Sequence, residues 1–333
     1  MATIFHSFVA SFLTYGLIFC IIVPSNADLL NDEFERWIKE SGKKYINEDE
    51  KLKRFAIFKS NYQFINSSNN NLEQTFKLGL NKYADLTNQE FRALLAGFIP
   101  STDKQPSTPF RYKNVMPPSS IDWRTRGAVT PVKDQGKCGS CWAFVTADAI
   151  EGITKITKGT LPTLSEQELI DCVNECQGCS GGRPDTAFKW VTKNGGITAK
   201  ADYPYKAENG ICDATKVKDF AAAITGYEDV PSGNETALMN AVANQPVTVA
   251  IDSAGLFFQF YQSGIFRGPC GKNLDHVMTA VGYGGDGLNK YWIVRNSWGT
   301  SWGENGYVRI WKDSGLRSGV CGITLVASYP VVD

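Results

Sequence analysis

The sequence predicts an α+β fold in two lobes, and a change of hydrophobic pattern along the chain is the basis of that prediction. Apolar residues recur at helical spacing between Cys141 and Lys158, and Gly159 follows as a helix stop. Farther along, β-branched and aromatic runs punctuated by glycine are typical of strands; they cover residues 247–251, 276–282, 291–294 and 307–311. A helical half followed by a strand-rich half is expected to form two lobes with a cleft between them.

The composition is that of a globular protein and excludes some partners. Of the 333 residues, 43% are apolar and 20% are charged, and the formal net charge is zero. The chain has no block of five or more like charges, so it indicates neither a nucleic-acid partner nor an anionic membrane. With two histidines in all and no closed set of cysteine ligands, we expect no metal and no cofactor.

The first 27 residues have the pattern of a secretory signal. The stretch from Phe8 to Val23 is almost continuously apolar, and Ser25-Asn26-Ala27 supplies a cleavage site. A membrane anchor is the alternative, but the run is shorter than the ~20 residues that a spanning helix needs. We therefore expect entry into the secretory pathway, where the sequons at Asn66 and Asn234 are candidates for glycosylation.

A helical prosegment and a linker follow the signal. Residues 28–95 carry apolar and aromatic residues at helical spacing and contain no cysteine. Between about residues 98 and 120, five prolines lie among serine, threonine and lysine, which indicates an exposed linker that a protease could cut. The expected divisions are therefore a signal at 1–27, a prosegment at 28–116 and a body at 117–333.

Cys141 and His276 are residue types used in nucleophilic catalysis. Cys141 begins the predicted helix, and a helix N-terminus favours the thiolate, which is the nucleophilic form. His276 is the one histidine of the body, so an imidazole base for that thiol has no competitor. The alternatives are a disulfide or a redox pair with Cys138 for Cys141, and a core position in an apolar strand for His276.

Two side-chain amides complete the candidate site. Asn296 follows a predicted strand, and its oxygen could accept the imidazole N–H and fix which ring nitrogen faces Cys141. Trp298 could cover that hydrogen bond. Gln135 lies six residues before Cys141, so its amide and the Cys141 backbone N–H could form an oxyanion hole. Taken alone, Asn296 is a turn residue and Gln135 a polar loop residue.

Three segments of the body together resemble the active-site segments of papain-like cysteine proteases: QGKCGSCWAF at 135–144, Asp275-His276, and NSWGTSWGENGY at 296–307. The resemblance covers essentially the whole body. It implies a papain-like two-lobed fold, with a helical N-terminal lobe, a β-barrel-like C-terminal lobe and the active-site cleft between them. It also implies that Cys141 is the nucleophile, His276 the general base and then acid, Asn296 the orienting residue and Gln135 the oxyanion donor.

The prosegment independently resembles the propeptides of that family. Six residues match a helix motif at every spacing: Glu50, Arg54, Phe58, Asn61, Ile65 and Asn69. Four more resemble a second propeptide motif: Gly79, Asn81, Tyr83 and Asp85. The resemblance implies a prosegment that occupies the cleft, aids folding and inhibits the enzyme until cleavage near Pro117. The alternative, an ordinary amphipathic helix, does not account for six matches in register.

The resemblance further implies the disulfides and the substrate-binding residues. Spacing alone does not select a pairing, but the family pattern gives Cys138–Cys179, Cys172–Cys212 and Cys270–Cys321 and leaves Cys176 free. The pocket for the second residue before the scissile bond (P2) is implied to be apolar, with Pro184, Ala250, Val277 and Val326 as lining and Arg183 at its edge. Arg183 is either a solvated rim charge or an aid to acidic or polar groups. The remaining implied substrate contacts are Gly139, Gly181, Gly182, Asp275 and Trp298.

The expected protein is thus a monomeric cysteine endopeptidase zymogen that resembles plant members of the family. It would act on polypeptides through a thioester acyl-enzyme, be inhibited by its own propeptide and by cystatin-type inhibitors, and reside outside the cell or in a vacuole or lysosome. A catalytically silent storage or binding relative is the alternative from another class. A transferase that uses the same acyl-enzyme is a second alternative.

Overall fold

A computed structural model describes residues 26–100 and 109–333 of the chain. Most of the predicted signal, residues 1–25, and part of the predicted linker, residues 101–108, lie outside this range. The chain forms two units that divide after Lys44. The first contains helix α1 (Asn26–Ser41), on which the rings of Phe34 and Trp37 stack at 6.0 Å. Within the described ranges, no helix has the length and apolar character needed to cross a membrane.

The second unit begins with helix α2 (Glu48–Asn69), strand β1 (Phe76–Leu78) and helix α3 (Asn88–Leu95). The prosegment motif explains their packing, because its polar members bond the chain that follows α2. The Asn61 amide donates to the carbonyl oxygens of Ala84 and Leu86, at 2.8 and 3.0 Å. The Arg54 guanidinium lies 3.0 Å from the Glu90 carboxylate in the first turn of α3. The motif therefore places α2 against residues 84–90.

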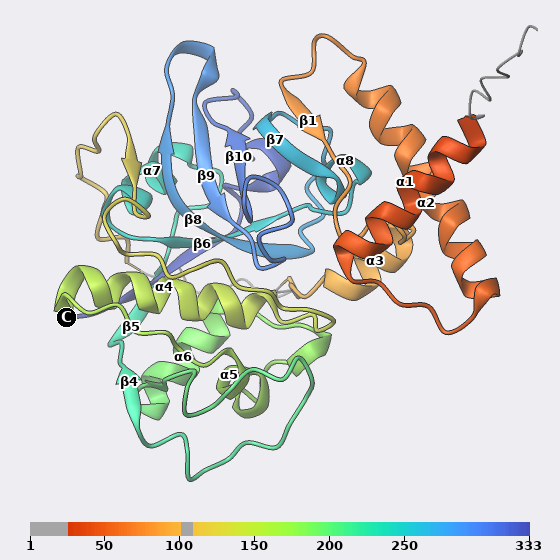
Figure 1. The fold of residues 1–333 in the computed structure, drawn as a ribbon. Helices are drawn as coiled ribbons and strands as arrows, with labels where there is room; N and C mark the ends of the chain where they lie inside the picture. The colour runs from red at the N-terminus through yellow and green to blue at the C-terminus, as the bar shows by residue number, and fades with distance from the viewer. Residues whose placement is uncertain (1–25, 101–108) are drawn as a thin grey trace, which may run out of the picture. The chain divides into compact units, whose positions relative to one another are not determined.

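The helical lobe is built on α4 (Cys141–Lys158). This helix has the predicted bounds, and Gly159 ends it in the left-handed conformation, with φ at 78°. Its first fourteen residues are buried, since α4 packs on the helices of its own lobe and on the sheet of the other lobe (Figure 1). The smaller elements of this lobe are α5 (Glu166–Cys172), η1 (Gly178–Ser180), α6 (Pro184–Asn194), β3 (Ile197–Thr198) and β4 (Phe220–Ala222).

The strand-rich lobe contains a sheet in the order β1-β7-β10-β9-β8-β6-β11-β5, with β2 (Ile121–Asp122) paired to β8. Its other strands are β5 (Gly226–Asp229), β6 (Val247–Ile251), β7 (Tyr261–Phe266), β8 (His276–Gly284), β9 (Tyr291–Arg295), β10 (Tyr307–Trp311) and β11 (Ala327–Val331). Between them lie α7 (Glu235–Asn244), α8 (Leu256–Gln259), η2 (Gly287–Asn289) and η3 (Val320–Gly322).

The two lobes confirm the predicted α+β class and the strand-rich C-terminal lobe, and one detail of the prosegment needs correction. The sheet is an open path from β1 to β5 and not a closed barrel. The prosegment is not purely helical, because β1 pairs antiparallel with β7 and extends the sheet of the body. An exposed edge strand offers unpaired backbone groups, and here the prosegment satisfies them.

Three disulfides join the pairs that the resemblance implies: Cys138–Cys179, Cys172–Cys212 and Cys270–Cys321. The cysteines without a disulfide in residues 26–100 and 109–333 are Cys141, which is buried, and Cys176, which is half-buried. The disulfide alternative for Cys141 is therefore excluded, and so is a redox pair with Cys138.

Candidate active site

The end of one strand and the start of its neighbour bring His276 and Asn296 together. His276 begins β8 and Asn296 directly follows β9, and these strands pair antiparallel. The Nε2 atom of His276 lies 2.9 Å from Oδ1 of Asn296. Trp298 stacks on the imidazole with ring centroids 4.7 Å apart, and all three side chains are buried. The indole thus lies against the His276 imidazole, where it can shield the bond to Asn296 from water.

The hydrogen bonds of Asn296 determine the tautomer of His276. The backbone N–H of Ser297 donates to the same Asn296 Oδ1 at 2.8 Å, so the atom that faces the imidazole is an acceptor. His276 Nε2 must therefore carry the proton, and Nδ1 carries a lone pair. Within the described residues, Nδ1 has no hydrogen-bond partner. A neutral His276 can therefore accept a proton at Nδ1 without breaking its bond to Asn296.

Cys141 begins α4, and its sulfur is buried against the start of β8. Backbone N–H groups of Val277, Trp142 and Gly97 hydrogen-bond the sulfur, yet burial outweighs them and raises the pKa of Cys141 to about 12. Burial likewise lowers the pKa of His276 to about 4, against its hydrogen bond with Asn296. In this covered form of the chain, burial therefore opposes the thiolate that a helix N-terminus favours. With the sulfur covered, desolvation outweighs the field of the helix N-terminus, and both groups are neutral.

Gln135 is held in place from both lobes. Its Nε2 donates to the Cys138 carbonyl oxygen at 2.8 Å and, at 3.4 Å, to that of Leu95. Its Oε1 accepts from the Ser297 hydroxyl at 2.6 Å, and its backbone N–H donates to the Ser297 carbonyl oxygen at 2.8 Å. The amide therefore has one orientation, with the NH₂ group on the side of the Cys138–Cys141 turn. Sequence reasoning missed Ser297, because a serine beside an asparagine carries no signal of a bond across the lobes.

Residues 96–99 run through the site as an extended segment. The N–H groups of Gly97 and Phe98 donate to the Asp275 carbonyl oxygen at 3.2 and 3.1 Å. Gly182 donates to the Gly97 carbonyl oxygen at 2.9 Å and accepts from the Ile99 N–H at 3.2 Å. The predicted exposed linker is therefore wrong at its start, where Phe98 is 8% exposed. The composition indicated a proline-rich linker. It could not indicate the backbone hydrogen bonds that this segment makes with Asp275 and Gly182.

Gly97 passes close to the Cys141 sulfur. A Cβ atom there would lie 2.2 Å from the Gly139 carbonyl oxygen and 3.0 Å from Cys141 Sγ. A Cβ at Gly181 would lie 3.2 Å from the Gly97 carbonyl oxygen. The family resemblance implies three glycines as substrate contacts, and these glycines thus line the path of residues 96–99: Gly139, Gly181 and Gly182.

The residues implied for the P2 pocket are brought together only in part. Ala250 and Val277 lie in one buried apolar cluster, which also contains Phe98 of the prosegment. Val326 lies beside this cluster, because its carbonyl oxygen accepts from the Ala250 N–H at 2.9 Å, and its side chain is 43% exposed. Two further residues form the edge of α6: Pro184 is its buried first residue, and Arg183 precedes it. The Arg183 guanidinium makes two bonds to the Asp185 carboxylate, at 2.9 and 2.6 Å, so its charge is paired and not simply solvated.

The second prosegment motif docks on the strand-rich lobe. Gly79 donates its N–H to the Phe260 carbonyl oxygen at 2.9 Å, and the Asn81 amide donates to that of Gln259 at 2.7 Å. The rings of Tyr83 and Trp298 pack in a T-shaped arrangement, with centroids 6.1 Å apart. The prosegment therefore covers the indole that shields His276, as well as the cleft.

Two family models match the chain. Residues 117–331 match the papain family cysteine protease model, and residues 34–91 match the cathepsin propeptide inhibitor domain (I29). The chain is 50% identical to the senescence-specific cysteine protease SAG39 of Oryza sativa subsp. japonica, over 94% of this chain and 95% of that protein. It is 46% identical to the senescence-specific cysteine protease SAG12 of Arabidopsis thaliana, over 98% and 97% of the two chains.

Two solved structures of precursor forms are similar to this chain over more than 90% of its length. A recombinant stem bromelain precursor superposes with a TM-score of 0.85 at 45% identity, covering 92% of this chain and all of that chain. The proform of the ragweed pollen allergen Amb a 11, a cysteine protease, gives a TM-score of 0.87 at 38% identity, covering 93% and 96%.

Proposed function

Because this chain belongs to the papain family of cysteine proteases and carries a cathepsin-type inhibitory propeptide, we propose that it is an endopeptidase zymogen that acts through Cys141. The observation that carries the proposal is the orientation of His276: Nε2 is bonded to Asn296, and Nδ1 has no hydrogen-bond partner among the described residues. We propose a signal at 1–27, a propeptide at 28–116 and an enzyme at 117–333. Met116 is 94% exposed, which favours cleavage at this boundary.

Each residue of the site has a step in the proposed reaction. His276 Nδ1 takes the thiol proton, and the Cys141 thiolate attacks the scissile carbonyl carbon. The oxyanion accepts hydrogen bonds from Gln135 Nε2 and the Cys141 backbone N–H. As the C–N bond breaks, His276 gives its proton to the leaving amine, and a thioester remains on Cys141. His276 then deprotonates a water that attacks the thioester, which releases the acid and restores the thiol. Asn296 keeps the imidazole in position throughout.

The propeptide inhibits by filling the site and by keeping both reacting groups neutral. Leu95 turns its carbonyl oxygen toward Gln135 Nε2, and Gly97 lies over Cys141. Removal of the propeptide returns water to the cleft. This relieves the burial that raises the pKa of Cys141 and lowers the pKa of His276. The proton can then move from sulfur to imidazole, which gives the reactive ion pair.

Gly97→Ala should weaken this inhibition. The added methyl group would lie inside contact distance of the Gly139 carbonyl oxygen, and overpacking of this kind costs ~1–3 kcal/mol. We expect a peptidyl epoxide to label Cys141 in the unprocessed variant at neutral pH roughly tenfold faster than in the parent zymogen. Gly226→Ala is the control, since a Cβ there meets no atom within 4 Å. Equal labelling rates for Gly97→Ala and the parent would contradict this mode of inhibition.

Specificity at P2 is proposed to be apolar. Phe98 of the propeptide shares a buried cluster with Ala250 and Val277, so an apolar group already occupies this part of the cleft. Asp185 pairs the charge of Arg183, which leaves little attraction for an acidic side chain. A peptide library should give kcat/KM at least ~10-fold higher for leucine or phenylalanine than for arginine or glutamate at P2. A preference for a charged residue there would contradict the proposal.

The compartment is proposed to be the secretory pathway, with delivery outside the cell or to a vacuole or lysosome. Three disulfides favour an oxidising compartment. Asn66 on α2 and Asn234 at the start of α7 are both exposed, as glycosylation requires. We also propose that the enzyme is a monomer and that cystatin-type inhibitors use the vacated cleft.

Acid activation of the full-length protein tests the proposed activity. We expect loss of the propeptide and then hydrolysis of a peptide substrate, whereas a silent storage or binding relative would do neither. Product analysis with an added amine acceptor separates hydrolysis from transfer. A predominance of amine adduct over free acid would contradict the assignment as a hydrolase.

A further inference from the structure

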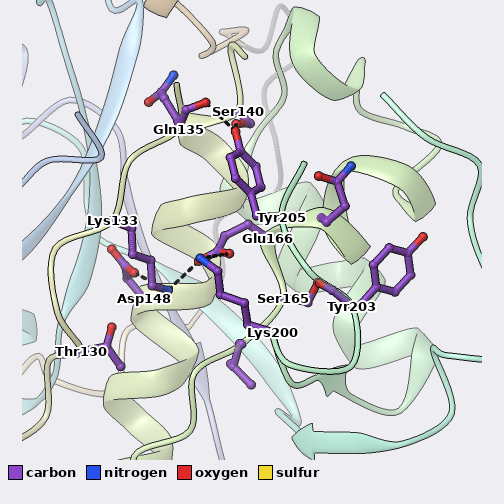
Figure 2. A network of polar contacts seen from close by, with 12 residues as sticks. Thr130, Lys133, Gln135, Ser140, Asp148, Ser165, Glu166, Lys200, Tyr203 and Tyr205 are labelled. Carbon is purple, nitrogen blue, oxygen red and sulfur yellow. Dashed lines mark hydrogen bonds and ion pairs between the residues drawn. The ribbon is translucent and has the colours of Figure 1, made fainter. Parts of the chain in front are cut away.

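One tyrosine of the helical lobe holds both ends of the turn that leads into Cys141. The Tyr205 hydroxyl donates to the carbonyl oxygen of Gln135 at 2.6 Å and lies 3.0 Å from the Ser140 hydroxyl (Figure 2). Its ring meets the edge of Phe144 in the first turn of α4, with centroids 4.9 Å apart. Tyr205 is 64 residues from Cys141 in sequence, so this contact is created by the fold alone.

We infer that Tyr205 is a positioning residue for the oxyanion hole, and this inference depends on the proposed role of Gln135. An oxyanion hole requires its two donors to converge on one oxygen atom. Here one donor is the amide of Gln135 and the other is the backbone N–H of Cys141, the residue after Ser140. The Tyr205 hydroxyl connects Gln135 to Ser140, whose peptide bond to Cys141 carries the second donor, and so restrains the distance between the two donors.

The direction of the hydrogen bonds follows from the groups involved. A carbonyl oxygen only accepts, so Tyr205 must donate its single proton to Gln135. The Ser140 hydroxyl then donates to the Tyr205 oxygen. Burial raises the pKa of Tyr205 to about 12, so the phenol keeps this proton over the whole working range of a protease. The link is therefore present at acid and at neutral pH.

Ser297 and Tyr205 hold different parts of Gln135. Ser297 bonds its side-chain oxygen and its backbone N–H, whereas Tyr205 bonds its carbonyl group. Without the Tyr205 hydroxyl, Gln135 would keep its bonds to Ser297 and to the Cys138 carbonyl oxygen but would lose its link to Ser140 at the start of α4. The amide and the Cys141 N–H could then move apart, which weakens binding of the oxyanion more than binding of the substrate ground state.

Tyr205→Phe removes the hydroxyl and keeps the ring on Phe144. In the matured enzyme, with active sites titrated by a peptidyl epoxide, we expect kcat to fall roughly fivefold to tenfold, as for one lost hydrogen bond, with KM unchanged. The inhibition constant of a peptide aldehyde, whose adduct carries an oxyanion-like oxygen, should rise by the same factor. Gln135→Ala alone should lower kcat about 100-fold. Adding Tyr205→Phe to it should have no further effect, because the positioned group is then absent.

Tyr203→Phe is the matched control. Its hydroxyl bonds Asp171 at 2.9 Å and the Ile211 carbonyl oxygen at 3.3 Å, so the same atom is removed two residues away without a bond to Gln135 or Ser140. We expect its kcat to equal that of the parent. The inference is overturned if Tyr205→Phe leaves kcat and the aldehyde constant unchanged, if its effect persists in the Gln135→Ala enzyme, or if Tyr203→Phe reproduces it. An unchanged kcat in Gln135→Ala alone would overturn the proposed oxyanion role itself, and the inference with it.

Discussion

Cys141→Ser is expected to lower kcat by on the order of 10⁵-fold or more, as the loss of a nucleophile does in other hydrolases. A serine hydroxyl is far less acidic than a thiol, so the neutral imidazole of His276 would take its proton far less readily. The variant should also remain at full length in acid, because we expect the enzyme to remove its own propeptide with the same nucleophile. The measurement is hydrolysis of a peptide substrate by the parent and the variant after parallel acid treatment.

Cys176→Ser is the control for this change. Cys176 is the other cysteine without a disulfide in the described ranges, and it is half-buried. Its variant loses a free thiol but should keep kcat within about twofold, as expected for a substitution away from the reacting atoms. If Cys141→Ser and the parent hydrolysed the substrate equally, Cys141 would not be the nucleophile.

Lys133→Met should have the largest effect on stability. The Lys133 ammonium lies 2.7 Å from Glu151, 2.7 Å from Glu166 and 3.1 Å from Asp148, and its side chain is 6% exposed (Figure 2). Burial alone would lower the pKa of Lys133, but these carboxylates raise it above its usual range. Without the ammonium the carboxylates are left buried with fewer partners. The expected loss is ~3–5 kcal/mol of unfolding free energy.

A thermal scan of the zymogen measures this loss, and the midpoint should fall by roughly 6–20 °C. Lys200→Met is the control: within residues 26–100 and 109–333 its ammonium forms one ion pair, with Glu166 at 3.2 Å, and one third of its side chain is exposed. A partly exposed pair contributes about 1 kcal/mol or less. We call Lys133, Asp148, Glu151 and Glu166 the Lys133 cluster. Equal midpoints of thermal unfolding for the two variants would contradict a structural role for this cluster.

The Lys133 cluster also connects the lobes near the site. Lys133 precedes Gln135 by two residues, Asp148 and Glu151 belong to α4, and Arg295 at the end of β9 pairs with Asp148 at 3.1 Å. The cluster thus links the loop of the oxyanion donor, the helix of the nucleophile and the strand that precedes Asn296.

Local signals predicted the elements on which the site is built. Helical spacing and a glycine stop gave both ends of α4, and β-branched runs gave β6 and β10 with their observed bounds. The grouping of Cys141, His276, Asn296 and Gln135 needed the family resemblance, because each residue alone has an ordinary structural explanation.

What the sequence did not predict depends on partners far away in the chain. The three residues of β1 form a strand only because the edge of β7 is free to pair with them. Residues 96–99 become extended through bonds to Asp275 and Gly182. The neutral state of Cys141 likewise follows from burial that the prosegment completes, whereas the sequence shows only a helix N-terminus.

The central claim is that Cys141 is the nucleophile and that the propeptide covers it. Peptidyl epoxide labelling followed by peptide mapping tests both parts in one measurement, applied to the zymogen at neutral pH and to the acid-matured enzyme. We predict a single adduct on Cys141 in the matured enzyme and very slow labelling of the zymogen. An adduct on Cys176, or equally fast labelling of Cys141 in both forms, would contradict this account.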